Sequence, residues 1–436
     1  MSGICASPPR LLALLVAALA LVACGGAPPP APTASPAPTR AVAQPSPATS
    51  AFPLSPTLPS MPRPLALWVA EEGPAFEGVR ALARDFSAET GIPLEVVARP
   101  ADGLRLSLAT AALAGDPLPD LFWGDQELLA GLLADSQVQP PEVTLPQDTL
   151  PALRTAATAN RRLWGVPLST RHSLLLFYNR ALAPEAPATS DALIVRSRAA
   201  ATGEVAGLVM AWDEARWFLP WLSAFGGDPL DLDGQRISLE TPEMVAALDL
   251  LRELYVAAPD RDASYQRGQR LFAQGYAAFA IDGDWMAPRY RQMSNTLDLG
   301  IAPLPVIPAT GRPAPGLLGG TYLLFQRDLS GDDLARARAF ATWLLEPATQ
   351  ARMPAVLGRL PARAGALEAA HVAADPLLAA TATGAALAPG LPPTPAARCL
   401  LSAIEAWLPR LLDGAINQAE AAARMQVEAE QCLGQR

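Results

Sequence analysis

The chain has 436 residues and a formal net charge of −9, and all 33 of its basic residues are arginine. Without lysine it can form no lysine Schiff base or pyridoxal phosphate linkage, and it can contain no phosphate-loop lysine. Only two histidines, His172 and His371, are present, and no Cys-x-x-Cys or His-x-x-x-His spacing occurs. We therefore expect no metal and no cofactor. Because the chain is acidic and has no basic stripe, we also expect no nucleic-acid partner.

The N-terminus reads as the signal peptide of a lipoprotein. An apolar or small run from Leu11 to Ala23 follows Arg10 and ends in Leu-Val-Ala before Cys24. The run is too short to span a bilayer, which needs about 20 apolar residues. We predict a signal peptide over residues 1–23, lipidation of Cys24, and an extracytoplasmic protein lipid-anchored to the cell-envelope membrane. An ordinary secretory signal with a coincidental cysteine is the alternative.

Residues 24–64 are predicted to be a disordered tether. Thirteen prolines occur between Gly25 and Pro64. Such a segment cannot bury enough apolar surface to offset its ordering entropy, so a partly polyproline II spacer is expected.

After Leu65, short apolar strands alternate with amphipathic helices. A strand at 65–70 is followed by a helix that ends at Gly91 and a strand at 94–98, then a helix at 104–114. A strand at 121–123 and a helix at 126–134, for which Asp125 is a plausible N-cap, come next. Thr241-Pro242 begins a later helix. This order is typical of a parallel sheet in an α/β protein.

Two cysteines remain near the C-terminus, in a predicted helical hairpin. Helices over 398–412 and 417–433 turn at Asp413-Gly414, which brings Cys399 and Cys432 to a similar height. An extracytoplasmic compartment permits a disulfide between them. Two separately buried thiols are the alternative.

Motifs spread along the chain resemble the family 1 extracellular solute-binding proteins of ABC importers, a group that includes the maltodextrin-binding protein. The resemblance rests on their collinear order: Thr90-Gly91-Ile92, Pro119-Asp120-Leu121-Phe122-Trp123, Trp164-Gly165-Val166-Pro167, Phe177-Tyr178-Asn179-Arg180, Ala224-Phe225-Gly226-Gly227, Ala280-Ile281-Asp282-Gly283-Asp284-Trp285, Gly300-Ile301-Ala302-Pro303 and Leu360-Pro361-Ala362.

This resemblance implies a two-lobed periplasmic-binding-protein-like α/β fold with a hinge between the lobes. The N-terminal lobe would comprise residues 65–169 and 320–358, and the C-terminal lobe residues 173–314 and 364–436. Chain crossings are expected near 169–174, 314–321 and 358–363, where Gly316, Gly319 and Gly320 suit either a hinge or ordinary turns. The expected partners are a small-molecule solute and an ABC permease in the membrane. A monomer and no catalytic activity are also expected.

The resemblance also supplies candidate ligand-binding residues. Trp123 and Trp285 match family positions where a tryptophan lines the cleft, although either could instead be a core residue. Glu72, Asp125 and Glu214 match polar positions less securely, and Asp125 could be only an N-cap. Further candidates near these positions are Arg171, Arg216 and Trp217.

The sequence departs from the maltodextrin binders near the first crossing and at the late helix. Arg171 stands where those proteins look acidic, and Leu400-Leu401-Ser402 replaces an expected aromatic pair. A carbohydrate or a related polyol or sugar acid is therefore expected, not a maltodextrin held in the same way. Arg171 and Arg216 would suit a carboxylated or phosphorylated solute, or could be solvated or paired with Glu214.

Three other interpretations remain open. A secreted carbohydrate-active enzyme could use Asp282 and Asp284, although Asp-Gly-Asp more often marks a turn. Asp231, Asp233 and Glu240 resemble part of a calcium loop whose first ligand position would be a proline. A ligand sensor not coupled to transport is the third, and the sequence does not separate it from an importer component.

Overall fold

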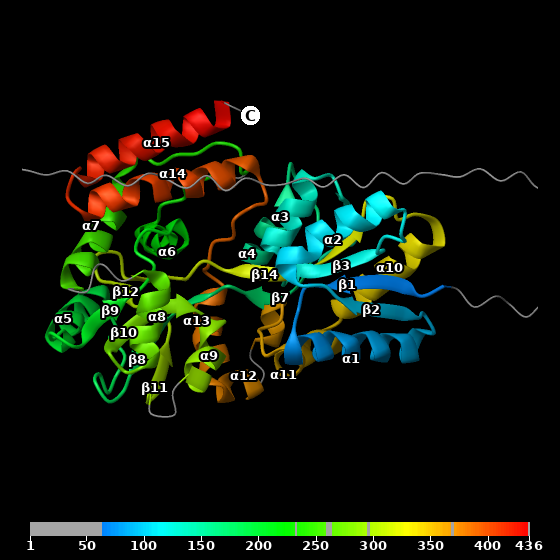
Figure 1. Ribbon diagram of the computed structural model, residues 1–436, viewed down its shortest axis with the longest axis horizontal. Helices are drawn as coiled ribbons and strands as arrows, with labels where there is room; N and C mark the ends of the chain where they lie inside the picture. The colour runs from blue at the N-terminus through cyan, green and yellow to red at the C-terminus, as the bar shows by residue number, and fades with distance from the viewer. Residues whose placement is uncertain (1–62, 232, 259–263, 294–296, 368–369, 435–436) are drawn as a thin grey trace, which may run out of the picture. The chain divides into compact units, whose positions relative to one another are not determined.

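The computed structural model describes residues 63–436, except 232, 259–263, 294–296, 368–369 and 435–436 (Figure 1). The predicted signal peptide, Cys24 and the proline-rich tether lie outside the described residues. Among those that are described, no helix is both long enough and apolar enough to cross a membrane.

The first sheet contains six strands and forms the centre of lobe 1. Its order is β2-β1-β3-β14-β4, and β7 also pairs with β14. The strands are β1 (Leu65–Val69), β2 (Leu94–Ala98), β3 (Leu121–Asp125), β4 (Val138–Gln139), β7 (Val166–Arg171) and β14 (Gly319–Gln326). The pairs of β1 with β2 and β3 are parallel, as the alternation of strands and helices predicts, whereas β14 is antiparallel to β3.

Local signals in the sequence explain the helices of lobe 1. Apolar residues at helical spacing bury one face of α1 (Gly73–Thr90), which ends at Gly91 with φ of 74°. α2 (Ala101–Ala114) and α3 (Gln126–Ala134) follow β2 and β3, and the side chain of Asp125 caps α3. α10 (Gly331–Leu344) and α11 (Pro347–Leu357) return to this lobe, where Phe340 packs against Phe86 with ring centroids 4.9 Å apart.

The second sheet has four strands in the order β11-β8-β10-β9 and forms the centre of lobe 2. The strands are β8 (Leu174–Asn179), β9 (Ala206–Val209), β10 (Ala277–Gly283) and β11 (Leu299–Ala302). Thr241 caps α7 (Pro242–Ala257) by accepting from the backbone of Met244, as its Thr-Pro start predicts. The other helices here are α5 (Ser190–Ala200), α6 (Ala215–Phe225), α8 (Tyr265–Ala273) and α9 (Met286–Met293).

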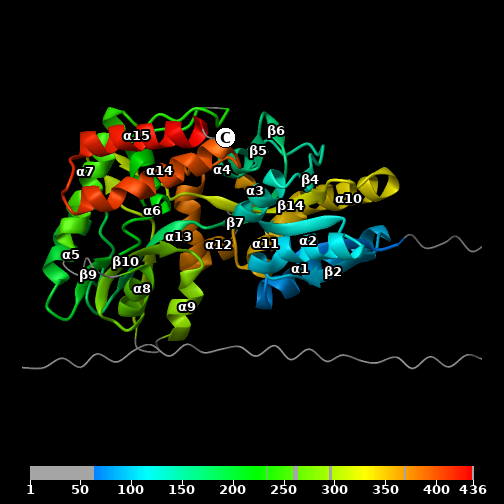
Figure 2. The ribbon, with the colours of Figure 1, turned by 45° about the horizontal axis from the view of Figure 1, so that its top comes forward.

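The C-terminal helices form a hairpin beside α7, visible at the end of the chain in Figure 2. α14 (Pro395–Leu412) and α15 (Gln418–Gly434) are separated by a turn, and the side chain of Asn417 accepts from the backbone of Glu420. The structure joins Cys399 and Cys432 in a disulfide with Cα atoms 5.6 Å apart. Cys399 is buried against lobe 2, so the bridge holds α15 onto the core.

The chain passes between the sheets at β7–β8 and again before β14. Gly319 pairs with Arg171, and a Cβ on Gly316 would approach the backbone oxygen of Leu174 to 3.0 Å, so these two passages lie side by side. Gly316 also has φ of 66°, which only glycine adopts readily. Shorter elements flank the passages: α4 (Pro151–Ala156), β5 (Thr158–Ala159), β6 (Arg162–Leu163), β12 (Val306–Ile307) and β13 (Arg312–Pro313).

The 358–363 segment, where a third crossing was expected, lies along β7. Leu360 accepts a hydrogen bond from the backbone of Thr170, and Ala362 donates to Leu168, so this segment stays on lobe 1 beside β7. The passage to lobe 2 comes later, through η1 (Ala364–Ala366), α12 (Ala370–Ala374) and α13 (Pro376–Ala385), of which α13 packs on β11.

Candidate functional site

A buried carboxylate lies at the centre of a group of arginines beside the first passage. Glu71, which follows β1, is only 4 % exposed. Arg359 binds it through two parallel hydrogen bonds of 2.6 and 2.9 Å, and Nη1 of Arg171 donates to both of its oxygens at 3.0 and 3.1 Å. Glu71 therefore ties the end of β7 and the 358–363 segment to β1. We call Glu71, Glu127, Arg171, His172, Arg216 and Arg359 the junction cluster.

The charges of this group stabilise one another. Burial alone would raise the pKa of Glu71, but the hydrogen bonds and charges of Arg359 and Arg171 outweigh it and hold the pKa below 4.5. Burial lowers the pKa of Arg359, and Glu71 more than reverses that effect. Both groups are consequently ionised at neutral pH.

His172 lies in the passage itself, between β7 and β8, with a left-handed φ of 62°. A non-glycine residue in this conformation costs about 1–3 kcal/mol and persists only where its surroundings fix it. Burial, and then the charge of Arg171, lower the pKa of its imidazole to about 3. Nε of Arg171 donates to Nε2 of His172 at 3.1 Å, so the neutral ring presents its proton on Nδ1.

An ion pair joins the two lobes beside His172. Glu127, in the first turn of α3, forms an ion pair with Arg216, in the first turn of α6, with Oε1 and Nη2 2.8 Å apart. The other oxygen of Glu127 lies 3.6 Å from Nδ1 of His172. Arg171 and Arg216, considered from the sequence as partners of Glu214, thus pair with Glu71 and Glu127 instead.

Trp285 is half-buried next to the junction cluster, at the carboxyl end of β10. Its ring centroid lies 5.3 Å from that of His172 and 6.3 Å from that of Trp217, and the rings of both pairs are nearly perpendicular. Trp217 is buried and donates from Nε1 to the backbone oxygen of Ile281 at 2.8 Å. Trp217, a predicted ligand-binding residue, therefore belongs to the core of lobe 2 and acts as a support behind Trp285.

The structure buries Trp123, which the resemblance predicted to line the cleft. β3 continues to Asp125, so Trp123 is in the middle of the strand, between Val69 of β1 and Leu323 of β14. Its side chain is fully buried in the apolar cluster that also contains Phe340. Because helices cover both faces of this sheet, a large residue in the middle of β3 enters a core whichever way it points.

The remaining predicted polar residues are Asp125, Glu72 and Glu214, which differ in their burial and in their contacts. Asp125 accepts from the backbone of Leu128 at 3.0 Å and is therefore an N-cap, yet it also lies close to His172. Glu72 is exposed at the start of α1. Burial, reinforced by Asp213 and Glu405, raises the pKa of Glu214, which precedes α6.

Several residues of this region were not among the ligand-binding residues predicted from the sequence. They are Glu71, Glu127, His172 and Arg359, together with Asp284, whose Oδ2 accepts from the backbone of Ser173 at 3.3 Å. One signal was available: Glu71 and Asp284 both lie close to the carboxyl ends of strands, where ligands of α/β sheets bind. Glu127 carried the weaker signal of an acidic residue in the first turn of a helix.

Asp125, Glu127 and His172 could in principle hold a metal ion, since their ligand atoms lie within 4.8 Å of one another. The atoms that would bind the metal already have other partners, however. Glu127 binds the guanidinium of Arg216, and Nε2 of His172 accepts from Arg171. The positive charges of Arg171 and Arg216, which contact these residues, would repel a divalent cation. The three side chains therefore do not suit a metal site.

The acidic residues considered for catalysis and for calcium also have other partners. Both oxygens of Asp282 are buried and accept from Tyr265, Tyr290, Gln269 and the backbone of Gly283. Asp231 accepts from the backbone of Gln235 and Arg236 in a turn, and Asp233 pairs with Arg161. These contacts suit structural roles at both places.

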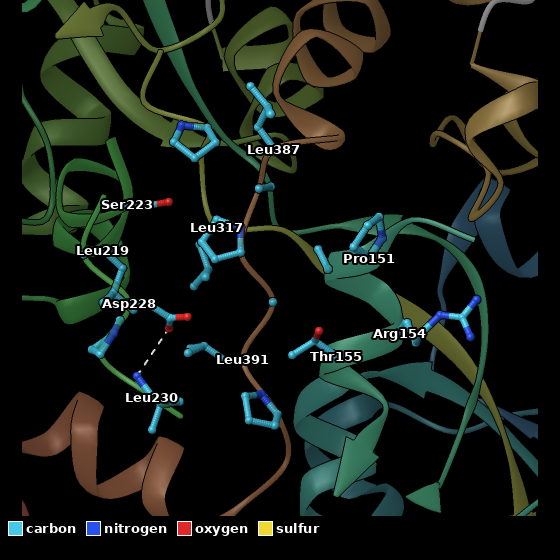
Figure 3. A pocket seen from close by; sticks show the side chains of 18 of the residues that line it. Pro151, Arg154, Thr155, Leu219, Ser223, Asp228, Leu230, Leu317, Leu387 and Leu391 are labelled. Carbon is cyan, nitrogen blue, oxygen red and sulfur yellow. Dashed lines mark hydrogen bonds between the residues drawn. The ribbon is translucent and has the colours of Figure 1, made fainter. Parts of the chain in front are cut away.

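A separate cavity of about 850 Å³ lies near the second passage (Figure 3). It is bordered by α4 on lobe 1, by α6 and residues 226–231 on lobe 2, and by the 387–392 segment. Its lining is mainly apolar, with Leu219, Leu230 and Leu317, and with the hydroxyls of Thr155 and Ser223. None of the ligand-binding residues predicted from the sequence lines it.

The sequence is similar to solute-binding proteins in each comparison with known proteins. Residues 81–380 match a family described as bacterial extracellular solute-binding protein. The maltotriose-binding protein of Pyrococcus abyssi is 25 % identical over 240 residues, which cover 53 % of this chain and 52 % of that protein. The maltodextrin-binding protein MdxE of Bacillus subtilis is 26 % identical over 172 residues, covering 36 % of this chain and 40 % of that one. This chain thus spans about half or less of the length of these relatives.

Solved structures extend the similarity to nearly the whole fold. The maltose-binding protein MalE of Listeria monocytogenes, solved in complex with maltose, superposes with a TM-score of 0.75 at 20 % identity. The match covers 85 % of this chain and 98 % of that chain. The two-lobed α/β fold predicted from the sequence is confirmed by this likeness.

Proposed function

Because the chain belongs to the bacterial extracellular solute-binding proteins, we propose that it binds a small carbohydrate between its lobes and delivers it to an ABC importer. Extracytoplasmic location follows from the family. Two of the similar proteins are named for maltotriose and maltodextrin, which supports a sugar as the solute.

The observation that carries the proposal is the convergence of both lobes beside Trp285. Sugar rings present apolar C–H faces and hydroxyl groups, which suit an aromatic surface flanked by guanidinium and carboxylate groups. Trp285 is half-buried, and the side chains of Arg216 and Glu127, 31 % and 48 % exposed, remain accessible from opposite lobes. Rotation about the two adjacent passages would bring these groups onto one solute without remaking either core.

Thermal-shift and calorimetric titration of the purified protein with maltose, maltotriose, polyols and sugar acids tests the proposal. A solute at one hundred times its Kd should stabilise the protein by about 2.7 kcal/mol. Trp285→Ala should weaken binding by about 1–3 kcal/mol, the usual range for a large aromatic contact. Trp407→Ala, which truncates a half-buried tryptophan of α14, is the matched control and should not change the affinity.

The cavity near the second passage is the other place where a solute could bind. Ser223→Ala removes one of its hydroxyls and should leave the affinity unchanged if the solute contacts Trp285. A loss of binding in Ser223→Ala, with none in Trp285→Ala, would move the site to the cavity. If no compound of the panel binds and glycans are hydrolysed instead, the enzyme alternative replaces the proposal.

We further propose that a lipid on Cys24 anchors the protein, which the Leu-Val-Ala-Cys sequence and the proline-rich segment support. Cys24→Ala should move the protein from the membrane fraction to the soluble one. Retention of that variant in membranes would contradict the anchor. Co-purification with a permease would separate the importer role from that of a sensor.

A further inference from the structure

Glu127 has two partners, and they belong to different parts of the molecule. One oxygen lies 2.8 Å from Nη2 of Arg216 of lobe 2 in an ion pair, and the other faces Nδ1 of His172 at 3.6 Å. Glu127 itself belongs to α3 of lobe 1. A single carboxylate therefore connects one lobe, the passage and the other lobe.

The partners of Glu127 are each connected to a group that a solute would meet. His172 lies edge-on to Trp285 with an interplanar angle of 90°, and it is held from the other side by Arg171. Arg216 retains part of its exposed surface, so its remaining N–H groups stay available to hydroxyls. Glu127 thus contacts the guanidinium of Arg216 and, through the imidazole of His172, is connected to the ring of Trp285.

We propose that Glu127 is a positioning residue of the solute site, and that its ion pair with Arg216 favours the arrangement in which the two lobes meet. The first half rests on the proposed function, whereas the second concerns the protein alone. An exposed ion pair contributes little to global stability, so the pair acts on the relative population of lobe arrangements. The charge of the carboxylate is the required feature, because a neutral amide attracts a guanidinium much less strongly.

The test compares Glu127→Gln with Glu77→Gln, which removes an exposed ion pair of α1 with Arg80. Both variants should unfold at the same denaturant concentration as the wild-type protein, within error. With maltotriose as the probe, Glu127→Gln should bind roughly fivefold more weakly, the size expected for a pair of this exposure. Its dissociation rate should rise, and the control should bind as the wild type does.

A second readout needs no solute. Spin labels on Ala109 of α2 and Ser402 of α14, both exposed, report the distance between the lobes in the full-length protein. Glu127→Gln should broaden this distance distribution, and 0.5 M salt should broaden that of the wild type but not that of the variant. The reversed pair, Glu127→Arg with Arg216→Glu, should restore the narrow distribution.

The possible results separate the two proposals. Distances and salt response in Glu127→Gln that equal those of the wild type would overturn the role of the ion pair. Failure of the reversed pair to restore the narrow distribution would do the same. If maltotriose and the rest of the panel fail to bind the wild type, the proposed function fails, while the distance measurements still decide whether Glu127 joins the lobes.

Discussion

Replacing Glu71 by glutamine should destabilise the protein more than any change at an exposed ion pair. The substitution leaves Arg171 and Arg359 facing each other around a neutral amide, with side-chain exposures of only 24 % and 19 %. Breaking a fully buried ion pair costs about 3–5 kcal/mol, and because both guanidinium groups keep some contact with water we expect about 2–4 kcal/mol here. Urea unfolding followed by far-ultraviolet circular dichroism measures the change in unfolding free energy.

The pH dependence of this change has a definite sign. The pKa of Glu71 is lower in the folded protein than its ordinary value of 4.5. Its contribution is therefore fully present above that value, and it is lost as the pH falls through the lowered pKa. The difference between wild type and Glu71→Gln should be constant from pH 6 to 8 and should shrink below pH 4.5. A difference under about 1 kcal/mol at pH 7, similar to that of Glu77→Gln, would refute the reasoning.

Two further predictions concern lobe 2. The double variant Cys399→Ser, Cys432→Ser should have a free energy of unfolding lower by about 3–4 kcal/mol, the value that the chain-entropy model gives for a loop of this size. Two alkylatable thiols in the oxidised wild-type protein would contradict the bridge. Asp282→Asn replaces one of the two oxygens that accept from four donors by an amino group, and should lower the free energy of unfolding by about 1–3 kcal/mol. An unchanged urea midpoint would contradict this prediction.

The elements that the sequence predicted well are those with local causes. The end of α1 at Gly91, the Asp125 cap of α3 and the Thr241 cap of α7 each depend on residues within one helical turn. The alternation of strands and helices predicted the parallel pairing of β1 with β2. In the three helices the determining residue lies next to the helix end that it determines.

The structure differs from the expectations where segments distant in the sequence determine the surroundings of a residue. Two consecutive acids follow β1; Glu71 is buried against Arg171 and Arg359, which lie 100 and 288 positions later, while Glu72 stays exposed. Trp123 was placed at a strand end because its sequence pattern does not show that β14 pairs with β3 as far as Asp125. The 358–363 segment was assigned to a crossing, although its backbone groups bond to β7. None of these partners is close in sequence, so local patterns could not identify them.

The pairing of the arginines bears on the kind of solute. Arg171 and Arg359 share Glu71, and Arg216 is matched by Glu127, while the acidic side chains of Asp125, Asp284 and Glu214 lie around them. An anionic solute would have to displace a carboxylate that is already held in place, and would then approach the remaining acids. An uncharged polyhydroxyl solute needs no such exchange, because guanidinium and carboxylate groups can donate to and accept from hydroxyls while keeping their ion pairs. The charges of the junction cluster thus favour a neutral sugar over the carboxylated or phosphorylated solute that two arginines alone suggested.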